Sequence, residues 1–267
     1  MNVIDLAWWQ LALAAALVLA LAATTLAARV GVARSLLIAA LRTVIQLSLI
    51  GLVLEALFAV GALHWIALMA LAMLLIAGRE VMARQQYRFT GAWSLGIGTA
   101  SMFISAFSVT VLTLVAIIGP DPWYRPQYAI PLLGMLLGNT MNGIALGLDR
   151  LTEGVWREAD VIENRLMLGQ TASEAVDEFR RSAVRAGMIP IINAMAAAGL
   201  VSLPGMMTGQ ILAGSPPAVA VKYQILIMFT VSAGTGFGTL AAVSAGARRL
   251  FDERERLRVD RLRRARA

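Results

Sequence analysis

Polar side chains interrupt an apolar segment in the middle of the chain. Residues 134–151 read GMLLGNTMNGIALGLDRL, so Asn139, Thr140 and Asn142 have mostly apolar neighbours. An unpaired amide in hydrocarbon costs several kcal/mol, so these side chains must face protein or a water-filled path. Amide and hydroxyl oxygens are also ligands that hard cations accept. The segment therefore predicts either hydrogen bonds between helices or the lining of a path for a cation, and the sequence leaves both open.

Few other polar side chains occur within the apolar segments. Arg42 and Gln46 share a helix face, and Arg42 lies close enough to the inner end of its segment to extend to the headgroups. Glu55 lies near the outer boundary, where solvation explains it most simply, and Glu80 is expected to pair with Arg84 at i+4. Polar side chains from three segments form our predicted path lining: Gln46, Glu55, Asn139, Thr140, Asn142 and Asn193.

The sequence does not identify a resident metal. The chain has no Cys and one histidine, His64, which cannot build the multi-histidine sites that zinc and copper favour. Carboxylate, amide and hydroxyl oxygens remain, which are compatible with Fe²⁺ without selecting it. No nucleophile and base form an obvious pair, so we expect a transport subunit rather than an enzyme.

The elements that position these residues must be membrane helices. The chain is 59% hydrophobic and only 15% charged, with a mean hydropathy of +0.73. No charged residue occurs between Asp5 and Arg29, and a helix crosses the bilayer core with about 20 residues. We predict an all-α, polytopic bundle of seven spans, with six spans plus a re-entrant segment at 208–218 as the alternative. The spans are predicted at about 7–28, 36–57, 62–80, 93–118, 127–148, 187–207 and 220–246.

The arginines orient the bundle. With the N-terminus outside, the outer segments contain only Arg125 and Lys222 as basic residues, whereas the inner loops and the tail are rich in arginine. The positive-inside rule therefore predicts an outer N-terminus and a cytoplasmic C-terminus. We expect a multi-pass protein of the bacterial plasma (inner) membrane. The first five residues, MNVID, lack a basic group, so we expect the first span to be retained.

The organisation we predict is a transmembrane permease domain over residues 1–247 and a basic cytoplasmic tail over 248–267. The tail mixes arginines with acids and suggests the i,i+4 pairs Asp252–Arg256 and Asp260–Arg264. We expect it to extend the last helix and to meet anionic lipid headgroups, with no nucleic acid as partner.

Residues 149–186 form the largest polar segment between spans, and we predict a cytoplasmic helical hairpin there. Apolar residues recur at helical spacing from Val155 through Ile162 to Leu166, and Gly169 ends that helix. Thr171 and Glu174 then match a capping box that starts the second helix. Such a hairpin either docks on a cytoplasmic partner or caps its own bundle, and architecture favours neither.

The segment from Glu163 to Gly169, ENRLMLG, follows the E-A-A-x-x-x-G pattern by which importer permeases of the ABC class engage their ATPases, with Asn164 and Arg165 in place of the alanines. Together with ALRTVIQLSLIG, IPLLGMLLGNTMNG, ENRLMLGQTASEAV and LVSLPGMMTGQILAG, it resembles the FetB family of ABC permeases, which includes plant aluminium-sensitivity membrane subunits. The resemblance extends from about residue 29 to residue 246.

This resemblance implies a half-transporter that pairs with a separate ATPase, as two copies of each, and exports a metal cation, with iron favoured. ATP and Mg²⁺ would bind to the ATPase, because this chain has no G-x-x-x-x-G-K-[ST] and its only lysine is Lys222. A self-contained secondary transporter or channel for a cation or small solute is the alternative. The residues implied in coupling lie in the hairpin: Val155, Ile162, Glu163, Leu166, Gly169, Thr171 and Glu174.

Overall fold

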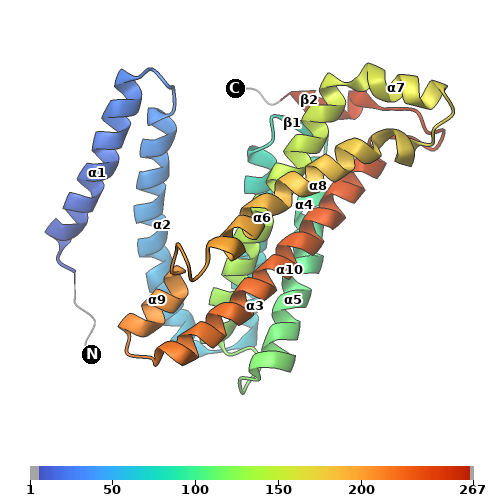
Figure 1. Ribbon diagram of the computed structural model, residues 1–267. Helices are drawn as coiled ribbons and strands as arrows, with labels where there is room; N and C mark the ends of the chain where they lie inside the picture. The colour runs from blue at the N-terminus through green and yellow to red at the C-terminus, as the bar shows by residue number, and fades with distance from the viewer. Residues whose placement is uncertain (1–5, 265–267) are drawn as a thin grey trace.

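The structure, a computed structural model, describes residues 6–264 and is helical almost throughout (Figure 1). The predicted all-α membrane fold is confirmed. Proline begins α6 (Pro126–Arg157) and α10 (Pro217–Arg249), the two longest helices. Proline lacks a backbone N–H, and the first turn of a helix does not use that donor. The elements are α1 Trp8–Ala27, α2 Ala33–Val60, α3 Leu63–Ala83, β1 Tyr87–Phe89, α4 Trp93–Met102, η1 Phe103–Phe107, α5 Ser108–Leu112, η2 Thr113–Ile118, α6 Pro126–Arg157, α7 Ala159–Met167, α8 Ala172–Ala197, α9 Gly205–Leu212, α10 Pro217–Arg249, η3 Val259–Arg261 and β2 Leu262–Arg264.

Six helical segments within residues 6–264 are long and apolar enough to cross a membrane. They are α1, α2, α3, the continuous segment Trp93–Ile118, α6 and α10. The predicted span at 187–207 is not one helix, because α8 starts in the charged hairpin and ends at Ala197. After the turn that contains Gly199 and Pro204, α9 continues towards the opposite end of the molecule (Figure 1). The sixth passage of the chain is therefore split, which corrects the prediction of seven continuous spans.

Small residues bring α6, α8 and α10 into close contact. A Cβ atom on Gly187 of α8 would lie 2.4 Å from the carbonyl oxygen of Gly143 in α6. A Cβ atom on Gly143 would lie 2.7 Å from the side chains of Thr235 and Thr239 in α10. Small residues thus allow the close approach at Gly143, whereas a Cβ on Gly138 would meet nothing within 4 Å.

The hairpin of α1 and α2 stands beside the main bundle (Figure 1). Ala22 is the one buried residue of α1, so nearly all of its apolar side chains are exposed, as suits a helix that faces lipid. An ion pair of 2.9 Å joins Arg42 of α2 to Glu80 of α3. This contact corrects two expectations, since Arg42 does not simply extend to the headgroups and Glu80 does not pair with Arg84.

The C-terminal tail does not extend α10. The chain leaves the helix after Arg249, and Leu250, Phe251 and Leu262 bury their side chains in the same core as the bundle. Strand β2 pairs antiparallel with β1, and the hydroxyl of Thr152 in α6 donates to the carbonyl of Tyr87 in β1. Residues 250–264 are therefore packed against the cytoplasmic end of the bundle, contrary to the expected helical tail, and they do not form a separate unit.

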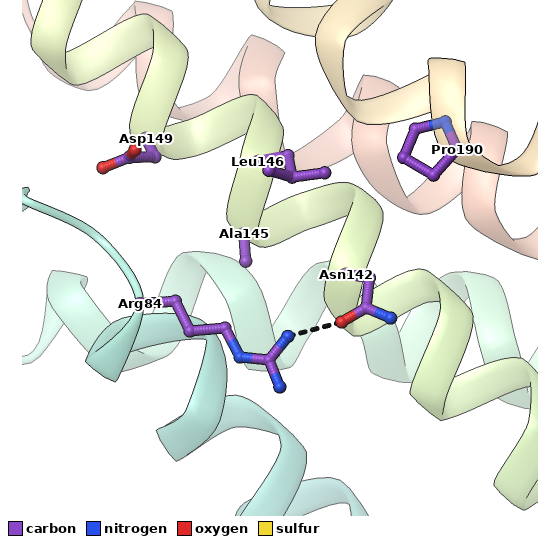
Figure 2. A pocket seen from close by; sticks show the side chains of 6 residues that line it. All are labelled: Arg84, Asn142, Ala145, Leu146, Asp149 and Pro190. Carbon is purple, nitrogen blue, oxygen red and sulfur yellow. Dashed lines mark hydrogen bonds between the residues drawn. The ribbon is translucent and has the colours of Figure 1, made fainter. Parts of the chain in front are cut away.

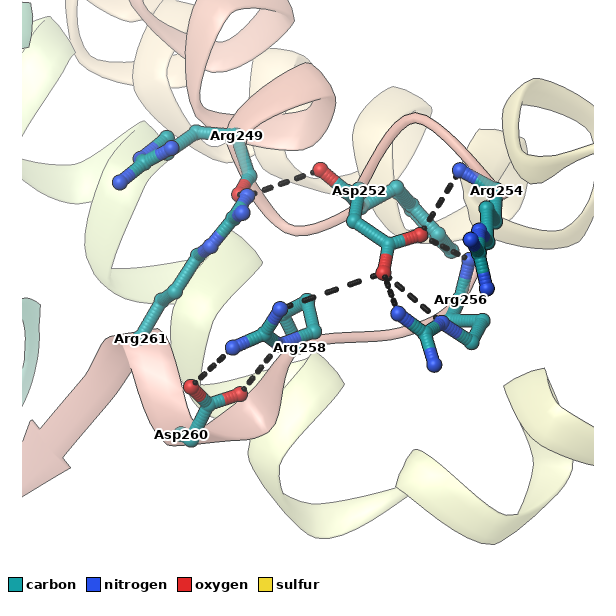
Figure 3. Close-up of polar contacts among 8 residues, drawn as sticks. Arg249, Asp252, Arg254, Arg256, Arg258, Asp260 and Arg261 are labelled. Carbon is teal, nitrogen blue, oxygen red and sulfur yellow. Dashed lines mark hydrogen bonds and ion pairs between the residues drawn. The ribbon is translucent and has the colours of Figure 1, made fainter.

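Asp252 explains why the helix stops (Figure 3). Its carboxylate accepts hydrogen bonds from the backbone N–H groups of Arg254 and Arg256, which offers the backbone an alternative to the helix. The predicted Asp252–Arg256 ion pair is present at 2.7 Å, but within a turn. Asp260 pairs with Arg258 at 2.8 Å instead of the predicted Arg264. Hydrogen bonds from Arg256, backbone and side chain, lower the pKa of Asp252 to about 2.

Candidate functional site

Asn142 lies in a hollow between α3, α6 and α8 (Figure 2). The guanidinium Nη1 of Arg84, at the end of α3, donates to its Oδ1 at 2.5 Å. The hollow has a volume of about 290 Å³ and contains charged, amide and apolar groups. Its lining residues are Arg84, Asn142, Ala145, Leu146, Asp149 and Pro190.

The periodicity of α6 places Asn142 and Asp149 on one face. They are seven residues apart, two helical turns, so both side chains reach the same side of the helix. Oδ1 of Asp149 accepts a hydrogen bond of 2.6 Å from the backbone N–H of Gln86, just after Arg84. The hollow therefore combines an amide oxygen, a carboxylate and a guanidinium on walls supplied by Ala145, Leu146 and Pro190.

The other predicted path residues of α6 and α8 have different surroundings. Thr140 is fully buried on another face of α6, where a Cβ on Gly238 of α10 would meet its Cγ2 at 2.5 Å. Asn139 is exposed, and its Nδ2 donates to the carbonyl of Met135 in its own helix at 2.8 Å. Asn193 is exposed on α8 and does not line the hollow. Thr140 thus packs between helices, which corrects its predicted place in the path.

Gln46 and Glu55 are exposed on α2 and contribute nothing to the lining of the hollow. Of the six residues predicted for the path, the hollow contains Asn142 alone. The prediction missed Arg84 and Asp149 because both lie just beyond the ends of predicted spans. The spacing from Asn142 to Asp149 was the available indication, since residues seven apart share a helix face.

The cytoplasmic hairpin forms as predicted, from α7, a turn and the first part of α8. The Thr171 hydroxyl accepts from the Glu174 N–H at 3.3 Å, and the Glu174 carboxylate accepts from the Thr171 N–H at 2.8 Å. These two hydrogen bonds complete the capping box. The Thr171 N–H and the Thr171 hydroxyl both donate to the Glu174 carboxylate, and these two donors lower the pKa of Glu174. Gly169 makes the turn between the two helices. Its φ of 90° is a backbone conformation that residues other than glycine rarely adopt.

The apolar stripe of the hairpin faces its own bundle. Val155 and Ile162 are fully buried, and Leu166 is half-buried against the same core. Val155 and Ile162 hold α7 in place and present no surface to a partner, so this part of the stripe is not a docking face. Glu163 and Glu174 remain exposed on the hairpin.

Two apolar side chains that were not among the predicted coupling residues lie at the tip of the hairpin. Met167 is 77% exposed and Leu168 is 86% exposed, immediately before Gly169. Beneath them, Arg165 makes an ion pair of 2.7 Å with Glu178 and lies over the ring of Phe179. Arg165, which stands in place of an alanine of the E-A-A pattern, thus holds α7 against α8. Met167 and Leu168 project from the tip as exposed apolar side chains.

Comparison with known proteins identifies the family. The model of the uncharacterised protein family UPF0014 matches residues 8–251. The chain belongs to this family. It is 40% identical over 224 residues to a UPF0014 membrane protein of Synechocystis, a match that covers 82% of this chain and 83% of that protein. No solved structure matches the chain.

Two further relatives have descriptive names. The chain is 34% identical to a protein of Escherichia coli named as a probable iron export permease, FetB, across 83% of each chain. It is 32% identical to the protein ALUMINUM SENSITIVE 3 of Arabidopsis thaliana, across 70% of this chain and 66% of that one. Together with its apolar helices, these similarities make this UPF0014 member a multi-pass membrane transport permease of the bacterial inner membrane.

Proposed function

We propose that the chain is the membrane subunit of an ABC transporter that exports a metal cation, with iron favoured. A separate cytoplasmic ATPase subunit binds ATP and Mg²⁺ and docks on the hairpin. The observation that carries the proposal is the exposed pair Met167–Leu168 at the tip of a braced and capped hairpin. An apolar projection of this kind fits a groove on a partner, because large exposed apolar side chains mark sites of interaction.

Helix α6 provides the mechanical link. It runs without interruption from Pro126 to Arg157, carries Asn142 in its middle, and leads directly into α7. The buried contacts of Val155 and Ile162 make α7 move with the inner end of α6. A displacement of the tip is therefore transmitted to the hollow at Asn142.

The choice of a metal cation rests on ligand chemistry and on one relative. The hollow supplies amide and carboxylate oxygens, which hard cations accept. Within the part of the chain that the structure describes, no group of three His, Cys, Asp or Glu side chains could hold a metal ion. Weak coordination suits a cation that must leave again, and the name of the Escherichia coli relative favours iron as that cation.

Exposed amides support a second copy of the chain as partner. Asn139 and Asn193 lie on helices of the bundle, yet both side chains are exposed in the single chain. Amides are too costly to leave in lipid, so protein or water must cover these side chains. A second copy supplies both the cover and the other wall of a path.

The test is capture of the ATPase encoded beside this gene, co-expressed with the full-length chain and purified with it. We expect the double variant Met167→Asp/Leu168→Asp to abolish capture, because a charged tip cannot enter an apolar groove. The control is Val161→Asp, which places one aspartate on an exposed apolar position of α7 away from the tip and should retain capture, as each single variant at the tip should not. Undiminished capture by the double variant would contradict the docking assignment.

A further inference from the structure

The hairpin of α1 and α2 contains a groove of about 640 Å³ near the turn that joins its two helices. We propose that this groove binds an anionic phospholipid of the cytoplasmic leaflet, with the lipid phosphate on Arg34 and an acyl chain between α1 and α2. The groove lies outside the hollow at Asn142, so the proposal goes beyond the transport function and does not depend on it.

Short side chains open this groove between the two helices. Ala22 of α1 and Ala33 of α2 are buried, although α1 has no other buried residue. Apart from Arg34, the residues that line the groove are alanines, leucines and an isoleucine, and all of them belong to α1 or α2. Because the hairpin stands beside the main bundle (Figure 1), the groove is open to the lipid around the hairpin.

The groove has the depth and polarity of a phospholipid. Arg34 is the second residue of α2, close to the turn between α1 and α2. This turn lies at the same end of the molecule as α7 and the β1–β2 pair, which the positive-inside rule assigns to the cytoplasm (Figure 1). From Leu26 to Leu19 the apolar lining descends two turns of α1, about 10 Å towards the membrane centre.

Arg34 supplies a positive charge that the described chain does not neutralise. It forms no ion pair within residues 6–264, and no acidic side chain lines the groove. A guanidinium stays protonated at physiological pH, and its planar fork of N–H donors matches the oxygens of a phosphate. No side chain caps the start of α2, so the first backbone N–H groups of that helix are further donors near Arg34.

These features favour an anionic phospholipid over two other ligands. A zwitterionic phospholipid has the same phosphate, but its cationic group meets no acid in the groove and is repelled by Arg34. A free phosphate ester would bind Arg34 and leave the apolar lining unused. Basic pockets between membrane helices on the cytoplasmic side are where anionic headgroups bind, and this groove is of that kind.

A bound lipid would also contribute to the packing of the hairpin. Ala22 alone is buried in α1, whereas α2 is tied to the bundle by the ion pair of Arg42 with Glu80. An acyl chain between α1 and α2 adds apolar contacts to both helices. Because a ligand that binds only the folded state stabilises that state, the lipid holds α1 against α2.

The experiment measures lipid binding to the purified, delipidated full-length chain by native mass spectrometry. Dioleoyl phosphatidylglycerol is titrated against dioleoyl phosphatidylcholine, which has the same acyl chains. We expect the wild type to bind phosphatidylglycerol with a Kd about fivefold lower, and Arg34→Gln to abolish that preference. The matched control is Arg29→Gln, which removes the same charge from an exposed position of the same turn outside the groove and should change the Kd by less than about twofold.

A second pair of variants tests the apolar part of the site. Ala23→Leu fills the groove and leaves Arg34 in place, so it should weaken binding of phosphatidylglycerol, whereas Ala14→Leu, at an exposed position of α1 outside the groove, should not. Glycerol phosphate, which has no acyl chain, should not displace the lipid.

Three results would overturn the proposal. The first is equal affinity of the wild type for the two lipids. The second is an equal effect of Arg34→Gln and Arg29→Gln on the Kd for phosphatidylglycerol. The third is displacement of the lipid by glycerol phosphate at equal concentration, which would identify a site for free phosphate esters.

Discussion

At the scale of single residues, Asn142 shows how an amide is accommodated in an apolar helix. Its Oδ1 accepts a hydrogen bond from Arg84, while the exposed part of the side chain faces a hollow. Asn139, one turn earlier, donates to the carbonyl of Met135 in its own helix. Asn142 can therefore present its amide to a solute in the hollow, whereas Asn139 does not line the hollow.

We predict that Asn142→Leu reduces ATP-driven cation export by about tenfold or more, since one hydrogen bond to a charged group contributes about 1.5–3 kcal/mol. The measurement is uptake into inverted membrane vesicles at matched protein levels. Asn139→Leu is the control and should retain most of the rate, because its amide does not line the hollow. An equal loss of export rate in both variants would contradict a specific role of Asn142 in the path.

The contact of Gly187 with Gly143 predicts a stability effect. Gly187→Ala places a methyl group 2.4 Å from a backbone carbonyl, so we expect a cost of about 1–3 kcal/mol and a lower Tm. Gly138→Ala introduces the same methyl group in α6 with nothing within 4 Å and should leave the Tm unchanged or raise it. Thermal unfolding in detergent compares the two. A Tm for Gly187→Ala at or above that of Gly138→Ala would contradict the packing.

At the scale of elements, the tail joins parts of the cytoplasmic end that are distant in sequence. Strand β2 pairs with β1, and the carboxylate of Glu255 accepts from the N–H of Ala172 at the start of α8. Because the hairpin leads into α8, the tail braces the same hairpin that we propose as the docking site. Loosening the tail should therefore loosen the base of α8.

We predict that Asp252→Asn increases hydrogen exchange across residues 250–264 and at the start of α8. Figure 3 shows the carboxylate of Asp252 accepting from two backbone donors and from Arg256, and a neutral amide is a poorer acceptor for all three. Asp260→Asn is the control, with a smaller effect expected, because Asp260 bonds the side chain of Arg258. Equal protection in Asp252→Asn and the wild type would contradict the bracing role.

The same carboxylate gives a pH dependence. The pKa of Asp252 is lowered from 3.8 to about 2 in the folded chain, so the unfolded segment binds the proton more readily. The stabilisation is fully present above pH of about 4 and is lost as the pH falls towards about 2. The protection factors of residues 250–264, which correct for the pH dependence of intrinsic exchange, should therefore fall over that interval. Protection factors that stay constant throughout it would contradict the assignment.

The sequence predicted those elements whose cause is local. The capping box of Thr171 and Glu174 and the turn at Gly169 depend on neighbouring residues, and all formed as expected. The tail was predicted wrongly because Asp252 ends the helix through bonds to the backbone and distant contacts bury Leu262. Asn142 was identified from its residue type, but its partner Arg84 comes from another helix, and no spacing along the chain reveals that pairing.

At the scale of the whole molecule, the chain places the α7 hairpin and the β1–β2 pair at one end and α9 at the other (Figure 1). The positive-inside rule assigns the hairpin end to the cytoplasm. The predicted outer N-terminus, residues 1–5, lies outside the described residues. The sixth crossing of the membrane is split between α8 and α9. The side of the membrane on which α9 ends therefore tests both the orientation of the chain and whether α8 and α9 together cross the membrane.

The absence of cysteine makes that test direct, since single cysteines can be introduced into the natural chain. We predict that Ala213→Cys, exposed after α9, reacts with a membrane-impermeant maleimide in intact cells. Leu168→Cys at the hairpin tip should react only after the membrane is permeabilised. Labelling of both positions in intact cells would contradict the split passage and the orientation together.

The central claim is that this chain transports a cation with energy from a separate ATPase. The most direct measurement is ⁵⁵Fe²⁺ uptake, under reducing conditions, by vesicles that hold the chain and the neighbouring ATPase with the ATPase facing outward. Uptake should require ATP and the ATPase, and Met167→Asp/Leu168→Asp should abolish it. Iron movement by the chain alone, without ATP or ATPase, would contradict the account and identify a self-contained transporter or channel.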